Sequence, residues 1–168
     1  MARQVFYSFH FKPDCWRTNQ VRHIGSVEGE KPVSGNDWED IQAKGHAAVH
    51  KWIDAQLKRK SCAIVLIGKE TSERPYVEYE IIKAWNEGKG VLGIYIHNLK
   101  DKNRMQSAKG KNPFDNIVLD VNGKKVKLSG IVKAYNSQST VSTTVYKYIE
   151  DNIADWVEKA IEIRNKYS

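Results

Sequence analysis

The amino-acid sequence predicts an α/β domain in which helices flank a parallel sheet, with a β-hairpin insertion and a long C-terminal helix. Three short, mostly apolar runs at 4–10, 62–68 and 91–97 predict strands buried on both faces. Helical periodicity between the runs gives the alternating order that favours parallel strands with right-handed connections. A length of 168 residues fits a single domain, 1–168, because a second core would need more chain.

The N-terminal third predicts two helices around a loop. A short helix opens at Pro13, directly after the first strand. Residues 25–36 are rich in turn formers and predict an exposed loop. From Asp37, which can cap a helix, apolar residues recur at helical spacing to about Lys58. This last segment therefore predicts one long amphipathic helix.

The remaining segments predict a helix, a hairpin and a final helix. Pro75 suits the first position of a helix, and Gly88 ends that helix. Alternating runs around Asn122-Gly123 predict a β-hairpin over 117–128, because this dipeptide adopts the tight turn that hairpins prefer. From about Ser142, an apolar stripe at helical spacing predicts the long C-terminal helix.

The net charge of +7 and a pI near 9.3 raise the question of nucleic-acid binding. Basic residues concentrate at 100–111 and 124–127, where no aromatic side chain is interleaved to stack on bases. We therefore expect a solvated basic face and no nucleic-acid partner.

The sequence has neither a leader pattern at its start nor an apolar run of about 20 residues, the length needed to span a bilayer. We expect no membrane segment and a cytoplasmic location. Cys15 and Cys62 are the only cysteines, and we expect free thiols because Cys62 opens a buried strand.

Two motif look-alikes lack the context that their chemistry requires. The G-x-G-x-x-G pattern at 88–93 ends a helix, whereas a dinucleotide-binding loop opens one. His46 and His50 have the spacing of zinc ligands, but Ala47 stands where a zinc hydrolase of this type carries glutamate. We therefore predict no metal site. The sequence also lacks a phosphate-binding loop of NTPases and a nucleophile elbow.

The candidate site lies at the carboxyl ends of the predicted strands, where ligands bind in open α/β sheets. Ser8, Phe9 and His10 end the first strand. Tyr76 and Glu80 stand four residues apart on the helix after the second strand, so they share one face of it. A glutamate in an early helical turn also stabilises the helix dipole, which is the simpler alternative for Glu80.

Several short motifs together resemble one protein family. The segment from Phe6 to Phe9 resembles the first box of TIR domains, and Ser72 to Ile81 resembles their segment with an aromatic residue four before the catalytic glutamate. Further matching motifs are Trp38-Glu39, Val65 to Gly68 and Asn112 to Asp115. In combination, over residues 4 to about 116, they resemble the TIR-like subunit of the Thoeris anti-phage system. The resemblance implies a flavodoxin-like/TIR-like fold.

The resemblance also implies an enzyme that cleaves the nicotinamide–ribose bond of NAD. The implied product is a cyclic ADP-ribose-type signal that acts on a separate effector protein in anti-phage defence. Glu80 takes the catalytic position, with Phe9, Trp38 and Tyr76 as candidates to stack on a base and Ser8 and His10 as polar contacts. NAD is then the substrate, and no bound cofactor is implied. The resemblance leaves open which product forms and whether the chain forms a homo-oligomer.

Two other functions stay open at this point. One is a non-catalytic TIR-like adaptor or a module that binds a nucleotide signal. The other is an enzyme similar to nucleoside deoxyribosyltransferases, which also attack N-glycosidic bonds with a glutamate at the edge of the sheet.

Overall fold

The computed structural model describes residues 2–29 and 35–167, with the side chains of 35–37 left out. Within these residues, five strands form one sheet in the order β2-β1-β3-β4-β7, and every neighbouring pair is parallel. The strands are β1 (Arg3–Ser8), β2 (Val27–Gly29), β3 (Cys62–Ile67), β4 (Gly90–Tyr95) and β7 (Ala134–Tyr135). The α/β fold with a parallel sheet is therefore confirmed.

The three predicted strands are neighbours at the centre of this sheet. Ser8 of β1 pairs with Val65 of β3, and Val65 pairs with Gly93 of β4. All six residues of β3 are buried, as are all six of β4. This burial on both faces explains why the apolar runs show no polar alternation.

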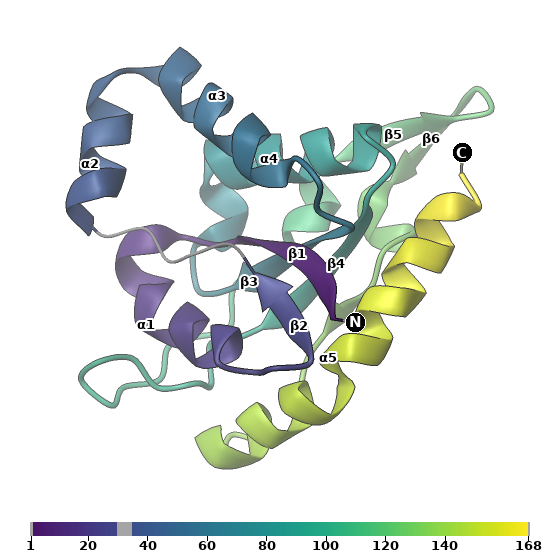
Figure 1. Ribbon diagram of the computed structural model, residues 1–168. Helices are drawn as coiled ribbons and strands as arrows, with labels where there is room; N and C mark the ends of the chain where they lie inside the picture. The colour runs from purple at the N-terminus through teal and green to yellow at the C-terminus, as the bar shows by residue number, and fades with distance from the viewer. Residues whose placement is uncertain (1, 30–34, 168) are drawn as a thin grey trace.

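Helices cover both faces of the sheet (Figure 1). One face packs against α1 (Phe11–Arg22) and the long α5 (Ser142–Asn165). The other packs against α3 (His46–Leu57) and α4 (Pro75–Asn86), while α2 (Gly35–Ala43) contacts α3. Successive side chains of a strand point to opposite faces, so Tyr7 joins the first core and Phe6 the second.

The predicted single helix from Asp37 to Lys58 is wrong, because the segment forms α2 and α3. Gly45 separates them with a φ of 95°, a left-handed conformation that glycine adopts without steric cost. Apolar residues continue at helical spacing across this break, which is why the sequence pattern missed it. Since α2 already begins at Gly35, Asp37 lies inside the helix and is not its cap.

Other boundaries also differ from the predictions. The predicted loop 25–36 contains β2 and the start of α2, and its residues 30–34 lie outside the described residues. α1 begins at Phe11, so Pro13 lies within the first turn, where its missing N–H costs no hydrogen bond. β7 pairs with β4 at the sheet edge and has only the two residues Ala134 and Tyr135.

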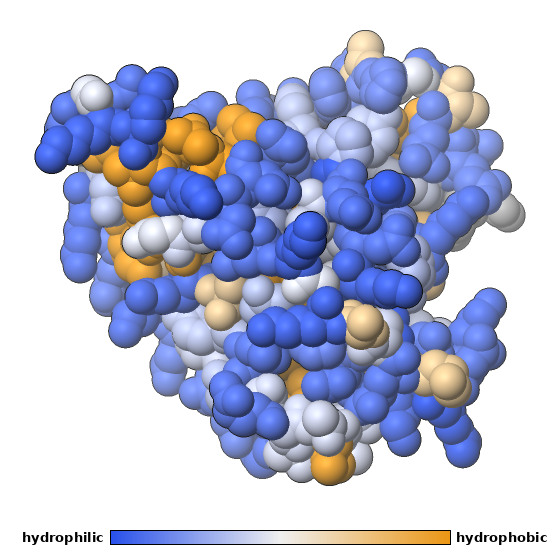
Figure 2. All heavy atoms as spheres, turned by 180° about the vertical axis from the view of Figure 1, so that it is seen from behind, coloured by the Kyte–Doolittle hydropathy of each residue, from blue (hydrophilic) through white to orange (hydrophobic). Residues whose placement is uncertain are grey.

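The predicted hairpin forms from β5 (Val118–Val121) and β6 (Lys124–Lys127). Its turn has φ of 54° at Asn122 and 81° at Gly123, as a tight hairpin turn requires. The hairpin lies between the 3-10 turns η2 (Pro113–Asn116) and η3 (Leu128–Gly130), and a third turn, η1 (Thr71–Glu73), precedes α4. Seen from behind, the molecule is mainly hydrophilic, and apolar side chains gather beside the hairpin (Figure 2).

The three glycines of the 88–93 pattern have structural roles. A Cβ on Gly90 would lie 2.8 Å from the backbone nitrogen of Ile161, so glycine permits the close approach of α5 to β4. Gly88, with a φ of 80°, follows the end of α4, and Gly93 packs against Ile67 and Phe114, so the three glycines meet separate local requirements. Cys15 and Cys62 are free thiols, as expected. No helix within 2–29 or 35–167 combines the length and apolar character needed to cross a bilayer.

Candidate active site

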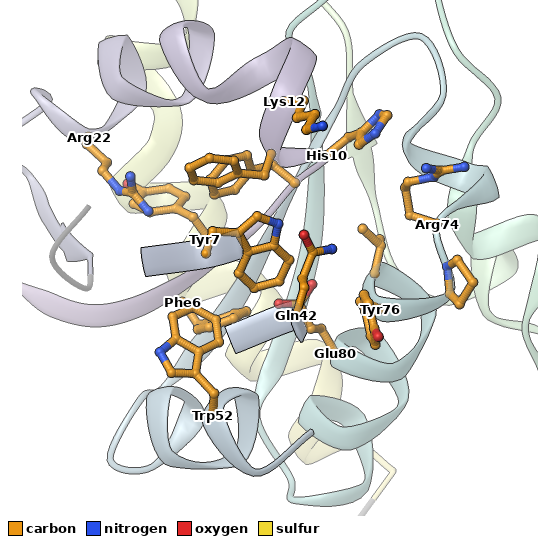
Figure 3. Close-up of a pocket in the computed structure, with 15 residues that line it drawn as sticks. Phe6, Tyr7, His10, Lys12, Arg22, Gln42, Trp52, Arg74, Tyr76 and Glu80 are labelled. Atoms are coloured by element: carbon orange, nitrogen blue, oxygen red, sulfur yellow. The ribbon is translucent and has the colours of Figure 1, made fainter. Parts of the chain in front are cut away.

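A pocket of about 340 Å³ opens at the carboxyl end of β1, between the starts of α1 and α4 and the helices α2 and α3 (Figure 3). Five of the predicted site residues line it: Phe9, His10, Trp38, Tyr76 and Glu80. These residues come from three separate parts of the chain, which the parallel sheet brings to one edge.

Glu80 forms a buried wall of the pocket. Its residue surface is only 7% exposed, and Ser8 Oγ donates a hydrogen bond of 2.7 Å to Glu80 Oε1. The apolar face of α4, which includes Val77 and Ile81, packs onto the sheet and thereby holds Glu80 against the end of β1. A buried carboxylate is costly unless polar groups support it, so the Ser8 hydrogen bond stabilises Glu80 at this position.

Ser8 itself is fully buried and does not line the pocket. The sequence predicted it as a polar contact to the substrate. In the structure its hydroxyl contacts the carboxylate of Glu80 from behind the pocket wall. This position suits a residue that orients Glu80.

Aromatic rings form most of the remaining wall. The rings of Phe11 and Trp38 stack with centroids 5.8 Å apart, and Phe9 lies 5.9 Å from Phe11. Trp38 also meets Trp52 and Tyr76 edge to face, at 5.6 Å and 6.4 Å. Flat rings of this kind can stack on the bases of a dinucleotide.

Polar contacts between α3 and α4 support this wall. The hydroxyl of Tyr76 and Nδ1 of His46 share a hydrogen bond of 2.8 Å, and Tyr79 donates one of 2.8 Å to Asp54. His50 stacks on Tyr79 at 3.9 Å. The two histidines with zinc-like spacing thus contact tyrosines. Among the side chains that the structure describes, in 2–29 and 38–167, no three His, Cys, Asp or Glu are grouped to hold a metal ion.

The mouth of the pocket is positively charged. Lys12 and Arg74 line the pocket there, and Arg22 lines it beside the rings of Tyr7 and Phe9, whereas Glu80 is the only carboxylate among the described lining residues. Burial lowers the pKa of His10 below its usual 6.5, and the nearby charge of Arg74 lowers it further. The neutral form of His10 is therefore favoured at pH 7. A neutral imidazole can donate one hydrogen bond to a ligand and accept another.

Sequence reasoning missed several lining residues. They lie beside the predicted site residues or on a helix that was interpreted only as core: Phe6, Tyr7, Phe11, Lys12, Arg22, Gln42, Trp52, Arg74, Pro75 and Val77. The sequence could have indicated Lys12 and Arg74, because each stands at the start of a helix that follows a strand end, where ligands bind in α/β sheets. Trp52 fitted the apolar stripe of its helix, so periodicity gave no sign of a second role.

Comparison with known proteins agrees with this geometry. Residues 6–101 match the family model described as "Thoeris protein ThsB, TIR-like domain", which is more than half of the chain. The chain belongs to this family. The matched region includes Ser8, the aromatic wall and Glu80, so the family resemblance predicted from short motifs is confirmed.

One relative in the ThsB family is the Bacillus cereus (strain MSX-D12) protein named "Putative cyclic ADP-D-ribose synthase ThsB1". It is 36% identical to this chain over 120 residues. The alignment covers 68% of this chain and 62% of the relative, so the chain matches less than two thirds of that protein's length.

Proposed function

We propose that this protein cleaves NAD at the bond between nicotinamide and ribose, with Glu80 as the catalytic carboxylate. The observation that carries the proposal is the position of Glu80, buried in the wall of an aromatic pocket and hydrogen-bonded by Ser8 at 2.7 Å. Family membership and the name of the Bacillus cereus relative support the same chemistry.

The reaction needs little acid–base assistance from the protein. When the bond between ribose C1′ and the nicotinamide nitrogen breaks, its electron pair leaves with nicotinamide, which becomes neutral. Positive charge then develops on the ribose ring, and the carboxylate of Glu80 stabilises it. A single carboxylate can therefore suffice where glycosidases that expel a poorer leaving group use two.

The second step decides the product. A nucleophilic atom of the same molecule attacks C1′, forms the new bond and releases one proton, which gives a cyclic ADP-ribose-type product. Attack by water would instead give linear ADP-ribose. Which product forms depends on whether the internal nucleophile or a water molecule lies nearer to C1′, and the name of the Bacillus cereus relative favours the cyclic product.

The proposal also covers the biological setting. The product would act as a signal on a separate effector protein in anti-phage defence, and the enzyme would work in the cytoplasm, where NAD is available. NAD is consumed as a substrate, and no bound cofactor or metal ion takes part.

Product analysis tests this function. Purified protein is incubated with NAD over a series of protein concentrations, with and without lysate of phage-infected cells, because a defence signal calls for a trigger. We expect nicotinamide and a product lighter than ADP-ribose by one water in mass spectrometry. A parallel reaction offers a deoxynucleoside and a free base. Base exchange there, with NAD intact under every condition, would overturn the proposal in favour of a deoxyribosyltransferase.

A further inference from the structure

The unusual feature of the pocket mouth is a pair of cations without carboxylate partners. Lys12 and Arg74 are both exposed and both line the pocket. Among the described residues, neither forms a salt bridge, although other exposed cations do, such as Arg3 with Glu158 and Lys147 with Asp151. In Figure 3 they lie with His10 on one side of the pocket, above Tyr76 and Glu80.

The placement of these cations is unfavourable for the two helices themselves. Lys12 lies in the first turn of α1, and Arg74 is the N-cap residue of α4. The N-terminus of a helix carries a partial positive charge, so cationic side chains there destabilise it. One carboxylate in each first turn, Asp14 in α1 and Glu78 in α4, offsets part of this cost, but neither lines the pocket. Neither N-cap side chain, His10 or Arg74, accepts a capping hydrogen bond from the helix. Two positive helix ends and two cations thus meet at one pocket.

An anion bound at the pocket mouth would reverse this electrostatic cost. A diphosphate suits the site because it offers two charged groups to two cations, and its remaining oxygens can accept hydrogen bonds from backbone N–H groups. His10 adds a polar group between the cations, since its Nδ1 is buried and has no hydrogen-bond partner. Glu80 lies deeper in the pocket, so the anion is not brought against the carboxylate.

We propose that Lys12 and Arg74 form a binding site for the diphosphate of a dinucleotide. The site orients the substrate with its diphosphate at the pocket mouth and its nicotinamide ribose toward Glu80. This orientation rests on the proposed function, whereas the diphosphate site itself does not. It would bind any nucleoside diphosphate whose base reaches the aromatic wall.

Equilibrium binding of ADP tests the site without turnover. Calorimetry compares the wild type with Lys12→Gln, Arg74→Gln and the double variant. We expect each single substitution to weaken ADP binding about tenfold and the double substitution at least about thirtyfold, because charge-assisted hydrogen bonds are lost. Adenosine, which has no phosphate, should bind all four proteins alike.

The matched control is the double variant Lys69→Gln/Lys102→Gln. It removes the same net charge from exposed lysines that do not line the pocket. The proposal is overturned if this control weakens ADP binding as much as the pocket variants do. It is also overturned if adenosine and ADP lose affinity equally, or if the wild type binds no ADP at millimolar concentration.

Turnover separates the two proposals. If NAD is consumed with an unchanged KM in Lys12→Gln/Arg74→Gln, the diphosphate site is wrong and the proposed function stands. If ADP binding depends on both residues but NAD is never cleaved, the diphosphate site stands and the proposed function is wrong. We expect a raised KM with kcat largely retained, because these cations contact a part of the substrate that does not react.

Discussion

Two regions of the molecule, the α5 face of the sheet and its carboxyl edge, use aromatic residues in opposite ways. On the α5 face, Tyr135 and Trp156 stack in parallel with centroids 4.2 Å apart, and Trp156 is only 7% exposed. At the carboxyl edge of the sheet, Phe11 of α1 and Trp38 of α2 stack more loosely at 5.8 Å beside a pocket of about 340 Å³. The first pair fills space within the core, whereas the second borders space that is left open.

Whether the space beside an aromatic ring is filled or open indicates whether the ring has a structural role or a binding role. A ring packed on both sides contributes mainly to the free energy of unfolding. A ring with one side toward a cavity has contact surface left for a ligand. Substitutions on the α5 face should therefore change stability, whereas substitutions at the pocket should change binding and turnover.

The largest effect is expected on the α5 face. Trp156→Ala removes a buried ring and its stack on Tyr135, so the free energy of unfolding should fall by about 3–5 kcal/mol. Urea denaturation measures this change. The matched control, Lys159→Ala, lies on the exposed side of the same helix and should change stability by less than about 0.5 kcal/mol. A loss below about 1 kcal/mol in Trp156→Ala would show that this stack is not a structural element.

The next effect is expected at Glu80. Glu80→Gln is nearly isosteric and keeps helix propensity, but it removes the charge that stabilises the transition state. Nicotinamide release should fall by about a hundredfold or more, equivalent to about 2.7 kcal/mol in the activation free energy. Glu78→Gln is the matched control, because Glu78 is exposed and rotated about 200° around the same helix. Circular dichroism melts check that both variants fold. If the wild type is active and Glu80→Gln keeps that activity, Glu80 is not catalytic.

Much of the fold could be predicted because its signals are local and strong. Continuous apolar runs mark β1, β3 and β4, and Asn122-Gly123 marks the hairpin. By contrast, β2 and β7 have three and two residues, too few to show any periodicity. Both lie at the edges of the sheet, where pairing with an existing strand decides the conformation. The break at Gly45 was hidden because apolar spacing continues across it.

The site was predictable only in part, because some of its residues are brought together by packing between helices, which leaves no local pattern in the sequence. The order of parallel strands places the ends of β1 and β3 at one edge, so the sequence indicates that Ser8 and Glu80 lie close together. Nothing in the order of elements shows that α2 and α3 turn their aromatic residues toward this edge. The contribution of Trp52 depends on the packing of α3 against α4, and sequence spacing does not contain that information.

A smaller effect is expected at the aromatic wall. Trp38→Ala removes a ring that can stack on a base, a contact worth about 1–3 kcal/mol. The KM for NAD should rise about tenfold, while the free energy of unfolding changes far less than in Trp156→Ala. Steady-state kinetics and urea denaturation measure the two quantities in one preparation. Trp38→Phe retains a flat ring and should recover part of the affinity. A large loss of stability with an unchanged KM would assign Trp38 to the core.

The smallest effect concerns two histidines, His10 in the pocket and His97 beside β4 and outside the pocket. Burial lowers both pKa values below 6.5, and the next contribution comes from Arg74 for His10 and from Lys109 for His97. Both histidines therefore contribute stability that is full above pH 6.5 and is lost as the pH falls through their folded pKa values.

Arg74→Gln separates the two histidines, because it removes a cation near His10 and leaves the surroundings of His97 unchanged. In an NMR titration of the imidazole rings, the pKa of His10 should rise in this variant and that of His97 should stay lowered. The stability lost between pH 7.5 and 5.5 should then shrink by a few tenths of a kcal/mol, since the folded and unfolded pKa values of His10 move closer together. Equal shifts at both histidines would mean that Arg74 acts through a change in the whole fold. An unchanged His10 would mean that Arg74 does not act at the pocket mouth, and this would remove one of the two cations from the diphosphate site.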